Sequence, residues 1–193
     1  MSVELPGFAD PVAGAQGCFR AVLAAMASPG SMHAAGEGLS PPAPLGRAMA
    51  AVLLSLVDGD TTLALDGDCA AARDWLVFHC GAPVVDSSAD AAFVAAHKLP
   101  DLARLRTGSD EAPEDAATLL LEVAAFGEGQ KLLLSGPGLK APAEFQVAGL
   151  PDDFTAAWAR NHALFPRGVD IILCAGARIA ALPRSLRITE GAV

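Results

Sequence analysis

The first apolar positions of the chain recur every three or four residues, the spacing at which side chains share one face of a helix. They are Phe19, Val22, Leu23 and Met26. Asp10 can cap this helix, and Pro11 fits its first turn. The pattern therefore predicts a helix from residue 11 that buries this face and ends before Pro29.

Four further stretches are predicted to be helical. Residues 44–56 carry a wide apolar stripe, which predicts a buried helix. Residues 71–81 are typical of a helix that ends at Gly81, because glycine adopts the left-handed conformation that often follows a helix. Residues 99–108 predict one short helix, and residues 151–162 predict a late one.

Short apolar runs bounded by Gly, Pro and charged turns predict the strands. Two hairpins are the strongest predictions, one from residues 118–124 and 131–136 and one from residues 169–176 and 177–183. Shorter strands are expected at residues 61–65, 82–85 and 91–95. Because hairpins are antiparallel, we expect an α/β fold with a mixed sheet, antiparallel hairpins and flanking helices. Residues 1–193 are expected to form a single domain.

The charge balance excludes one class of partner. The formal net charge is −9, whereas non-specific binding to nucleic acid needs clustered Lys and Arg. The apolar runs are interrupted before they reach the roughly 18 residues that a membrane span needs. The first residues also lack the basic and apolar regions of a secretory signal. We therefore expect no nucleic acid, no membrane and a cytoplasmic location.

The cysteines and histidines show no metal-ligand spacing, so no metal site is expected. Cys18 and Cys174 lie in apolar stretches and are interpreted as small core residues. His79 lies at a helix end, where the helix dipole favours a protonated imidazole, and its interpretation is structural. Cys80 directly follows it, but catalytic dyads are assembled in space, not by adjacency in the chain.

A Gly-rich turn, Ser135-Gly136-Pro137-Gly138, follows a predicted strand. Such a turn can present backbone N–H groups to a phosphate. It lacks the Gly-Lys-Ser/Thr of a Walker loop and the G-x-G-x-x-G of a dinucleotide-binding loop. Ordinary turn chemistry is therefore its first interpretation, and phosphate binding is the alternative.

Asp170 stands at the start of the last predicted hairpin, and Arg184 stands at its end. An acid at a strand start usually accepts hydrogen bonds from nearby turn amides, here those around Arg167 and Gly168. Two alternatives are an ion pair with Arg184 and a contact with a polar ligand. Arg184 also suits an interface, where arginine is enriched.

Four separated segments carry a combination that is more specific than any one of them. They are Phe19-Arg20 with Ala25-Met26 and Pro29-Gly30; Phe78-His79 with Ala82-Pro83; Ser135 to Leu139; and Phe165-Pro166, Gly168 and Asp170 with Pro183-Arg184. In this order and spacing, residues 10–189 resemble the PhnH family, the H subunit of the bacterial carbon–phosphorus lyase system.

The resemblance implies a fold like that of the pyridoxal-phosphate-dependent transferases, but working without that cofactor. Lys98, Lys131 and Lys140 are the only lysines, and none has a convincing Schiff-base setting. It also implies a homodimer within a core assembly with the G, I and J subunits, which converts alkylphosphonate and ATP to a ribose 1-phosphonate triphosphate. The J subunit then cleaves the C–P bond. The resemblance supplies no catalytic residue for H.

The resemblance and the residues together favour an accessory subunit without chemistry of its own. A stand-alone enzyme acting on a phosphonate or a nucleotide, and a metabolite-binding protein, are the alternatives. The binding or interface candidates are Ser135, Gly136, Gly138, Asp170 and Arg184. We expect the hairpin around Asp170 and Arg184 to be structural first and part of a binding surface second.

Overall fold

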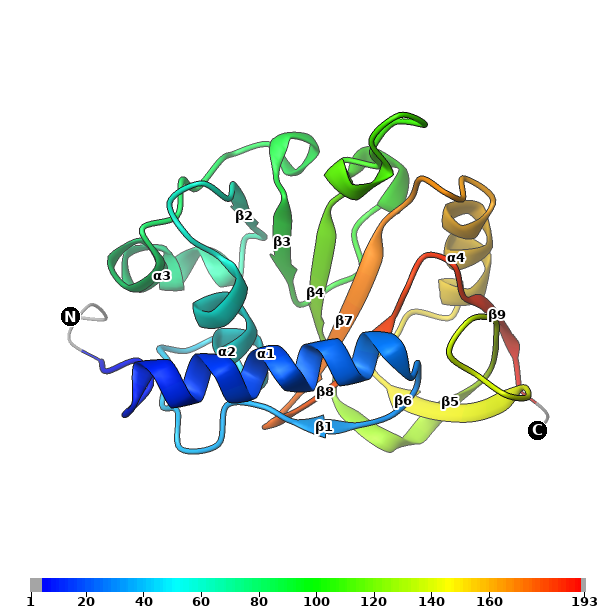
Figure 1. Cartoon of the computed structure of the whole chain (residues 1–193), viewed down its shortest axis with the longest axis horizontal. Coiled ribbons are helices and arrows are strands. Elements are labelled where there is room, and N and C mark those ends of the chain that lie inside the picture. Colours follow the sequence, from blue (N-terminus) through cyan, green and yellow to red (C-terminus); the bar gives the residue numbers. More distant parts are fainter. Residues whose placement is uncertain (1–4, 192–193) are drawn as a thin grey trace.

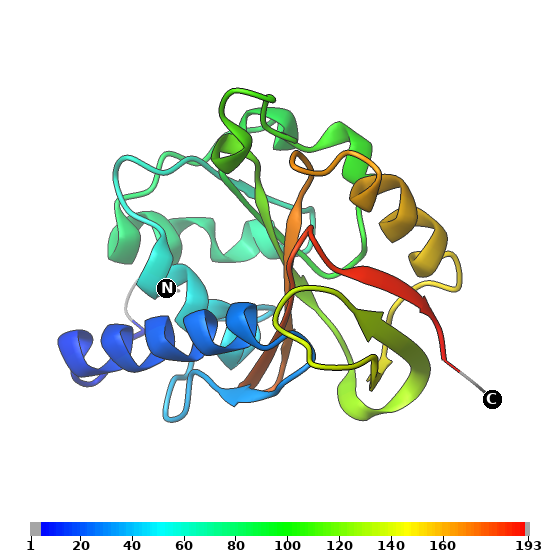
Figure 2. The same ribbon diagram turned by 45° about the vertical axis from the view of Figure 1, so that its right-hand side comes forward.

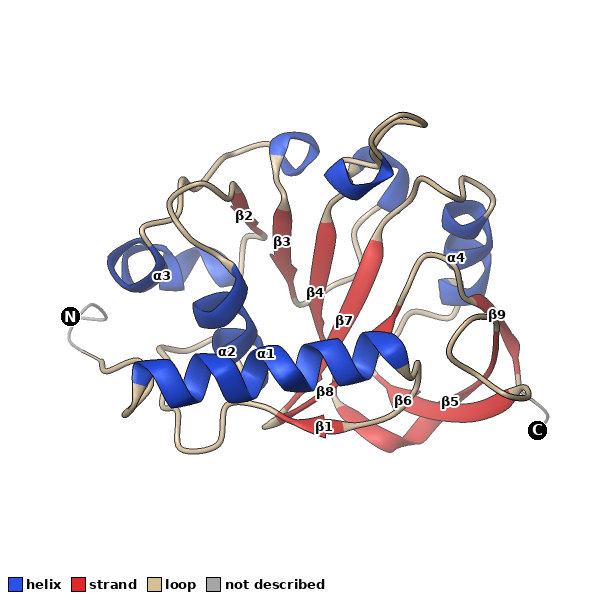
Figure 3. Ribbon diagram, viewed as in Figure 1, coloured by secondary structure: helices blue, strands red, loops and turns tan. Residues whose placement is uncertain are grey.

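The computed structural model describes residues 5–191 as helices and strands that alternate along the chain (Figures 1 and 3). The α-helices are α1 (Pro11–Ala27), α2 (Arg47–Leu56), α3 (Arg73–Cys80) and α4 (Phe154–His162). The strands are β1 (His33–Ala34), β2 (Leu63–Leu65), β3 (Phe93–Ala96), β4 (Thr118–Glu122), β5 (Ala125–Ser135), β6 (Ala143–Ala148), β7 (Asp170–Ala175), β8 (Arg178–Leu182) and β9 (Arg187–Glu190). This alternation confirms the predicted α/β class.

The strands form two sheets. The larger has the order β1-β8-β7-β4-β3-β2, in which β2, β3, β4 and β7 are parallel. At one edge, β8 pairs antiparallel with β7, and β1 pairs antiparallel with β8. The smaller is antiparallel, with the order β6-β5-β9. The predicted mixed sheet is therefore confirmed, and so is the hairpin of β7 and β8.

Alternation along the central strands creates two cores, because successive side chains of a strand point to opposite faces. In β4, Leu120 packs with residues of α1, α2 and α3, whereas Leu119 and Leu121 pack with α4 and the smaller sheet. The larger sheet thus lies between a helical layer and a mixed layer. Figure 2 shows β5 and β9 on the side away from α3.

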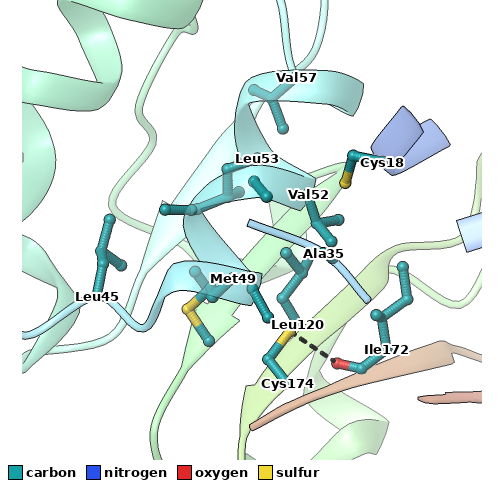
Figure 4. Packing of buried hydrophobic residues seen from close by; sticks show 14 of the residues in the cluster. Cys18, Ala35, Leu45, Met49, Val52, Leu53, Val57, Leu120, Ile172 and Cys174 are labelled. Carbon is teal, nitrogen blue, oxygen red and sulfur yellow. Dashed lines mark hydrogen bonds between the residues drawn. The ribbon is translucent and has the colours of Figure 1, made fainter. Parts of the chain in front are cut away.

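The helical layer is anchored by α2, which is buried along most of its length. Figure 4 shows Met49, Val52 and Leu53 of α2 close to Leu120 and Cys174 of the sheet. The predicted burial of this helix is confirmed. Cys18 and Cys174 are both buried in this cluster, as predicted.

The face of α1 that packs inward matches the predicted one only in part. Cys18, Val22 and Ala25 are buried, whereas Phe19 is 51% exposed and Leu23 is 59% exposed. The helix itself and its cap are confirmed, since Asp10 accepts the N–H groups of residues 12 and 13. The small side chains face the sheet because α1 packs closely on α2 and β8.

The hairpin predicted from residues 118–124 and 131–136 is wrong. β4 lies between β3 and β7 in the larger sheet, and β5 pairs with β6 and β9 in the smaller one. Its presumed turn belongs to β5 itself, which carries an irregularity between Phe126 and Gln130. Three consecutive buried leucines in β4 are typical of a central parallel strand that is covered on both faces.

Two short predicted elements are shorter in the structure than the sequence predicts. Residues 82–85 contribute only an isolated bridge, between Leu63 and Val84. Residues 99–108 contain a 3-10 turn at Leu102–Arg104 and no longer helix. Within residues 5–191, no helix is both long enough and apolar enough to cross a bilayer.

Candidate functional site

Asp170 and Arg184 form a largely buried ion pair. Asp170 begins β7 and Arg184 follows the end of β8, so the hairpin brings them side by side. The Arg184 Nε donates to both carboxylate oxygens, at 3.2 and 3.1 Å, and Nη2 bonds the same carboxylate. The two side chains are only 15% and 14% exposed. This is the bidentate geometry that makes Arg–carboxylate contacts strong.

Arg184 is held from three further directions. Its backbone N–H donates to Asp170 Oδ1 at 2.7 Å. Its Nη1 donates to the carbonyl oxygen of Pro113, and its own carbonyl oxygen lies 3.1 Å from Nδ1 of His162. Through these contacts, the charged pair links the hairpin to α4 and to the segment before β4.

The first interpretation of Asp170, as an acceptor for turn amides, is wrong. The N–H of Gly168 donates to Thr107 O at 2.9 Å, and that of Arg167 donates to Leu164 O at 3.0 Å. The ion-pair alternative is confirmed. Any further role of Asp170 or Arg184 in binding a ligand or a subunit stays a prediction.

The turn before β7 is fixed by the buried side chain of Asn161. Its Oδ1 accepts the N–H of Val169 at 2.8 Å, and its Nδ2 donates to Val169 O at 2.9 Å. A Cβ on Gly168, which has a φ of 111°, would lie 3.0 Å from Asn161 O. The positive φ and this close approach favour glycine at 168, and the two Asn161 bonds fix Val169, the residue before Asp170.

The Gly-rich turn packs closely on its own chain. Ser135 pairs with Arg187 in the smaller sheet. A Cβ on Gly138, at φ 86°, would lie 2.5 Å from Ala27 O, and one on Gly136, at φ 141°, would lie 3.3 Å from Ser185 O. The structure thus brings this turn against the end of α1 and the residues that follow Arg184. Close packing explains both glycines, and phosphate binding by the turn stays a prediction.

A second polar cluster lies where three parallel strands end. Asp66 follows β2, His97 follows β3, and Glu122 ends β4. Cys69 begins the 3-10 turn after Asp66 and is buried. The carboxyl ends of parallel strands are where α/β proteins usually place ligands. Residue spacing does not reveal this cluster, because its members are separated by up to 56 positions in the chain (122 − 66).

Hydrogen bonds hold the cluster in place. The two oxygens of Asp66 accept the N–H of Cys69 at 2.9 Å and the N–H of His97 at 2.7 Å. The Cys69 Sγ lies 3.2 Å from His97 Nδ1, and His97 Nε2 lies 3.1 Å from Pro44 O. One feature of the sequence indicates the cluster: Asp66 and His97 each directly follow a strand.

Burial perturbs the ionisable groups of this cluster. It raises the pKa of the Cys69 thiol far above its ordinary value, and hydrogen bonding and charge interaction with Asp66 raise it further. Both effects favour the protonated thiol. Burial would also raise the pKa of Asp66, but the N–H bonds from Cys69 and His97 lower it overall.

The negative charge of Glu122 is unfavourable in this buried position. Burial raises its pKa to about 7 from the ordinary 4.5, although the charge of His97 opposes this shift. Among residues 5–191, its Oε2 is buried and has no hydrogen-bond partner. A Cβ on Gly46 would lie 2.2 Å from Glu122 Oε1, so the carboxylate lies tightly against the start of α2.

The raised pKa of Glu122 predicts a loss of stability as pH rises. Below the pKa of Glu122 in the unfolded chain, both states are protonated and the free energy of unfolding is unaffected. As pH rises further, the unfolded state ionises first and the folded state loses stability, until the folded carboxyl also ionises near its own pKa and the loss becomes constant. In the presence of a chelator, Glu122→Gln should therefore gain on the order of 2 kcal/mol over wild type between about pH 5 and about pH 8. Urea unfolding at both pH values measures this difference. Glu128→Gln, at an exposed position, is the control, and an equal response of both variants would contradict burial as the cause.

The comparisons with known proteins indicate one family. A family model described as bacterial phosphonate metabolism protein (PhnH) matches residues 6–189. The PhnH subunit of alpha-D-ribose 1-methylphosphonate 5-triphosphate synthase from Rhizobium meliloti (strain 1021) is 39% identical over 186 residues, which cover 94% of this chain and 93% of the relative. A protein of Stutzerimonas stutzeri whose name describes it as a C-P lyase subunit, HtxG, is 42% identical over 83 residues, or 43% of each chain. The chain therefore belongs to the PhnH family of bacterial phosphonate metabolism proteins.

Proposed function

We propose that this chain is an accessory subunit of the carbon–phosphorus lyase core complex in phosphonate catabolism. The complex would form a ribose 1-phosphonate triphosphate from ATP and an alkylphosphonate before the C–P bond is cleaved. The main support is the similarity, over 94% of this chain, to a relative that is named as a subunit of such a synthase. The cytoplasm, where ATP is available, is the location that fits this role.

The chemistry of the described residues supports an accessory role. Burial raises the pKa of the Cys80 thiol to about 11, and it also raises the pKa values of Cys18, Cys69 and Cys174. A thiol needs the opposite shift to act as a nucleophile. Lys98, Lys131 and Lys140 are exposed, a setting that does not favour a Schiff base. The likeness to the pyridoxal-phosphate-dependent transferase fold, without its cofactor, is part of the proposal.

The exposed face of α1 is our candidate for the homodimer contact. Val12, Phe19 and Leu23 are 79%, 51% and 59% exposed. They are seven and four residues apart, so they lie along one side of the helix. Apolar side chains that gather on one face mark interaction sites more often than isolated ones do. The helix runs along the outside of the molecule in Figure 1, where a second copy could reach it.

Co-purification tests the accessory role. Tagged protein, expressed with the G, I and J subunits of its own host, should yield a stoichiometric assembly in native mass spectrometry. A lone homodimer that ignores all three partners would refute the proposal.

Two matched substitutions separate the surfaces of this assembly. Phe19→Glu places a charge on the exposed face of α1 and should convert the homodimer to monomers. Phe165→Glu alters a residue that is 57% exposed in the 165–189 region, and it should weaken binding of the other subunits while the homodimer persists. Sedimentation at a fixed micromolar concentration measures the first effect, and native mass spectrometry measures the second. Phe19→Glu protein that still dimerises would remove α1 from the interface.

The alternative is a stand-alone enzyme that binds a phosphonate or a nucleotide. A cleft of about 670 Å³ between residues 99–103 and α4 favours it, since small-molecule sites have this size. Its charged lining consists of Asp101, Asp153 and Arg160, which is a poor match for a polyphosphate. Turnover of ATP and methylphosphonate by the isolated chain would support this alternative over the accessory role.

A further inference from the structure

The cluster at the strand ends has the donor atoms of a transition-metal site. The carboxylate of Asp66, the thiol of Cys69 and the imidazole of His97 each offer one ligand atom, and these atoms all lie within 4.8 Å of one another. A zinc ion with tetrahedral ligands at its usual bond lengths separates neighbouring donors by roughly 3.3–3.8 Å. The Cys69 Sγ to His97 Nδ1 distance is 3.2 Å, and His97 Nδ1 to Asp66 Oδ1 is 3.9 Å. Closing around an ion therefore needs movements on the order of 1 Å.

The histidine is oriented for coordination. A carbonyl oxygen can only accept, so the 3.1 Å contact with Pro44 O requires a proton on His97 Nε2. In the neutral ring, Nδ1 then keeps its lone pair, and Nδ1 is the atom that faces Cys69 and Asp66. Metal-binding histidines usually donate their other N–H to a carbonyl or carboxylate in this way.

The carboxylate is oriented as well. Each oxygen of Asp66 accepts one backbone N–H, from Cys69 or from His97. A carboxylate oxygen has more than one acceptor position, so these two bonds leave lone pairs for an ion. Because both donors are backbone groups at strand ends, the carboxylate is held by the sheet itself.

The buried carboxylate of Glu122 is an independent feature that indicates a cation. Its buried Oε2 has no hydrogen-bond partner among residues 5–191. In the pairing of β3 with β4, Ala96 lies opposite Leu121, so Glu122, at the end of β4, lies next to the point where His97 follows β3. A bound cation would offset this buried negative charge, and Glu122 would supply balancing charge from outside the three-ligand group.

A catalytic triad does not fit this arrangement. In a triad, the nucleophile and the acid contact opposite nitrogens of the histidine. Here Cys69 and Asp66 both face Nδ1, and Nε2 is taken by Pro44. Cys69 is also fully buried, so a substrate could not reach its sulfur.

We propose that Asp66, Cys69 and His97 bind a divalent zinc-class ion at the carboxyl ends of β2 and β3, with Glu122 beside it. Thiolate and imidazole ligands favour zinc over magnesium and calcium, which prefer sites made of oxygen only. Binding would displace the proton of the Cys69 thiol to solvent and leave a thiolate on the metal. The ion would join the ends of two parallel strands to the residues before α2, through His97 and Pro44.

Metal content of the isolated full-length chain tests the proposal without the other subunits, so its outcome is separate from the accessory role. Protein is stripped with a chelator, reloaded with zinc, desalted and analysed for metal. Wild type should retain one zinc per chain. Cys69→Ser and His97→Gln should lose affinity by on the order of a hundredfold or more, since changes outside the ligand set alone cost about 10–100-fold. Cys80→Ser, which alters a cysteine outside the cluster, should bind as wild type does.

Cobalt binding provides a second measurement, for which the wild-type spectrum alone is sufficient. Co²⁺ bound by a thiolate gives a ligand-to-metal absorption band in the near ultraviolet, and wild type and Cys80→Ser should show it. Circular dichroism identifies any variant that fails to fold. In that case, the cobalt absorption spectrum of the wild-type protein alone tests the proposal. Wild-type protein that keeps no zinc and shows no cobalt–thiolate band would overturn the proposal. Zinc retained equally by Cys69→Ser would overturn it too, and the cluster would then serve only to tie two strand ends together.

Discussion

Arg184→Met should lower the free energy of unfolding by about 2–4 kcal/mol, because it leaves the carboxylate of Asp170 buried without its partner. The loss exceeds that of a surface ion pair since both side chains are about 85% shielded (15% and 14% exposed). The bond to Pro113 O would be lost with it. Urea unfolding at neutral pH measures the change.

Two controls test whether the buried charge is the cause. Arg104→Met removes an arginine that is 85% exposed and paired with Asp101, and it should change stability by less than about 1 kcal/mol. Adding Asp170→Asn to Arg184→Met removes the unpaired charge and should recover part of the loss. A double variant as unstable as the sum of the single variants would contradict coupling between these two residues.

Asn161→Ala should be comparably damaging, at about 2–4 kcal/mol, because it leaves two buried backbone groups of Val169 without partners. Asn161 is only 3% exposed, and it is the one polar residue classed as buried among residues 5–191. Its loss also frees the turn at Gly168 that positions Asp170. Urea unfolding reports the stability, and hydrogen exchange of the Val169 N–H should accelerate.

The neighbouring residue provides the matched control for this substitution. Arg160 lies on the same helix but is exposed, and Arg160→Ala should change stability by less than about 0.5 kcal/mol. Equal losses in both variants would mean that α4 is sensitive as a whole. The specific bonds of Asn161 would then not explain the result.

Local patterns were sufficient for elements whose burial follows from their own residues. The apolar stripe of α2 and the Gly81 end of α3 were predicted from the sequence, and both are present. The hairpin of β7 and β8 was predicted as well, because two apolar runs meet at a short turn around Gly176. In each case the decisive interactions lie within a few residues of one another.

The pairing of strands that are distant in the chain could not be predicted from local patterns. β4 and β5 are adjacent in the chain and both apolar, yet they belong to different sheets. The burial of β4 on both faces makes the parallel pairing with β3 and β7 more favourable than a hairpin. Likewise, α1 has more apolar residues than one face can hold, and close packing against α2 and β8 selected its small side chains for the inside.

The sequence by itself determined the α/β class, most of the helices, the last hairpin and the family, because these depend on periodicity, turn residues and the order of separated segments. Only the tertiary structure decided that Asp170 pairs with Arg184 and not with the amides around Arg167 and Gly168, since that choice depends on where the end of β8 lies. It alone placed Asp66, Cys69 and His97 together. The physical reason is that parallel strands bring their carboxyl ends to one edge, whatever the length of chain between them.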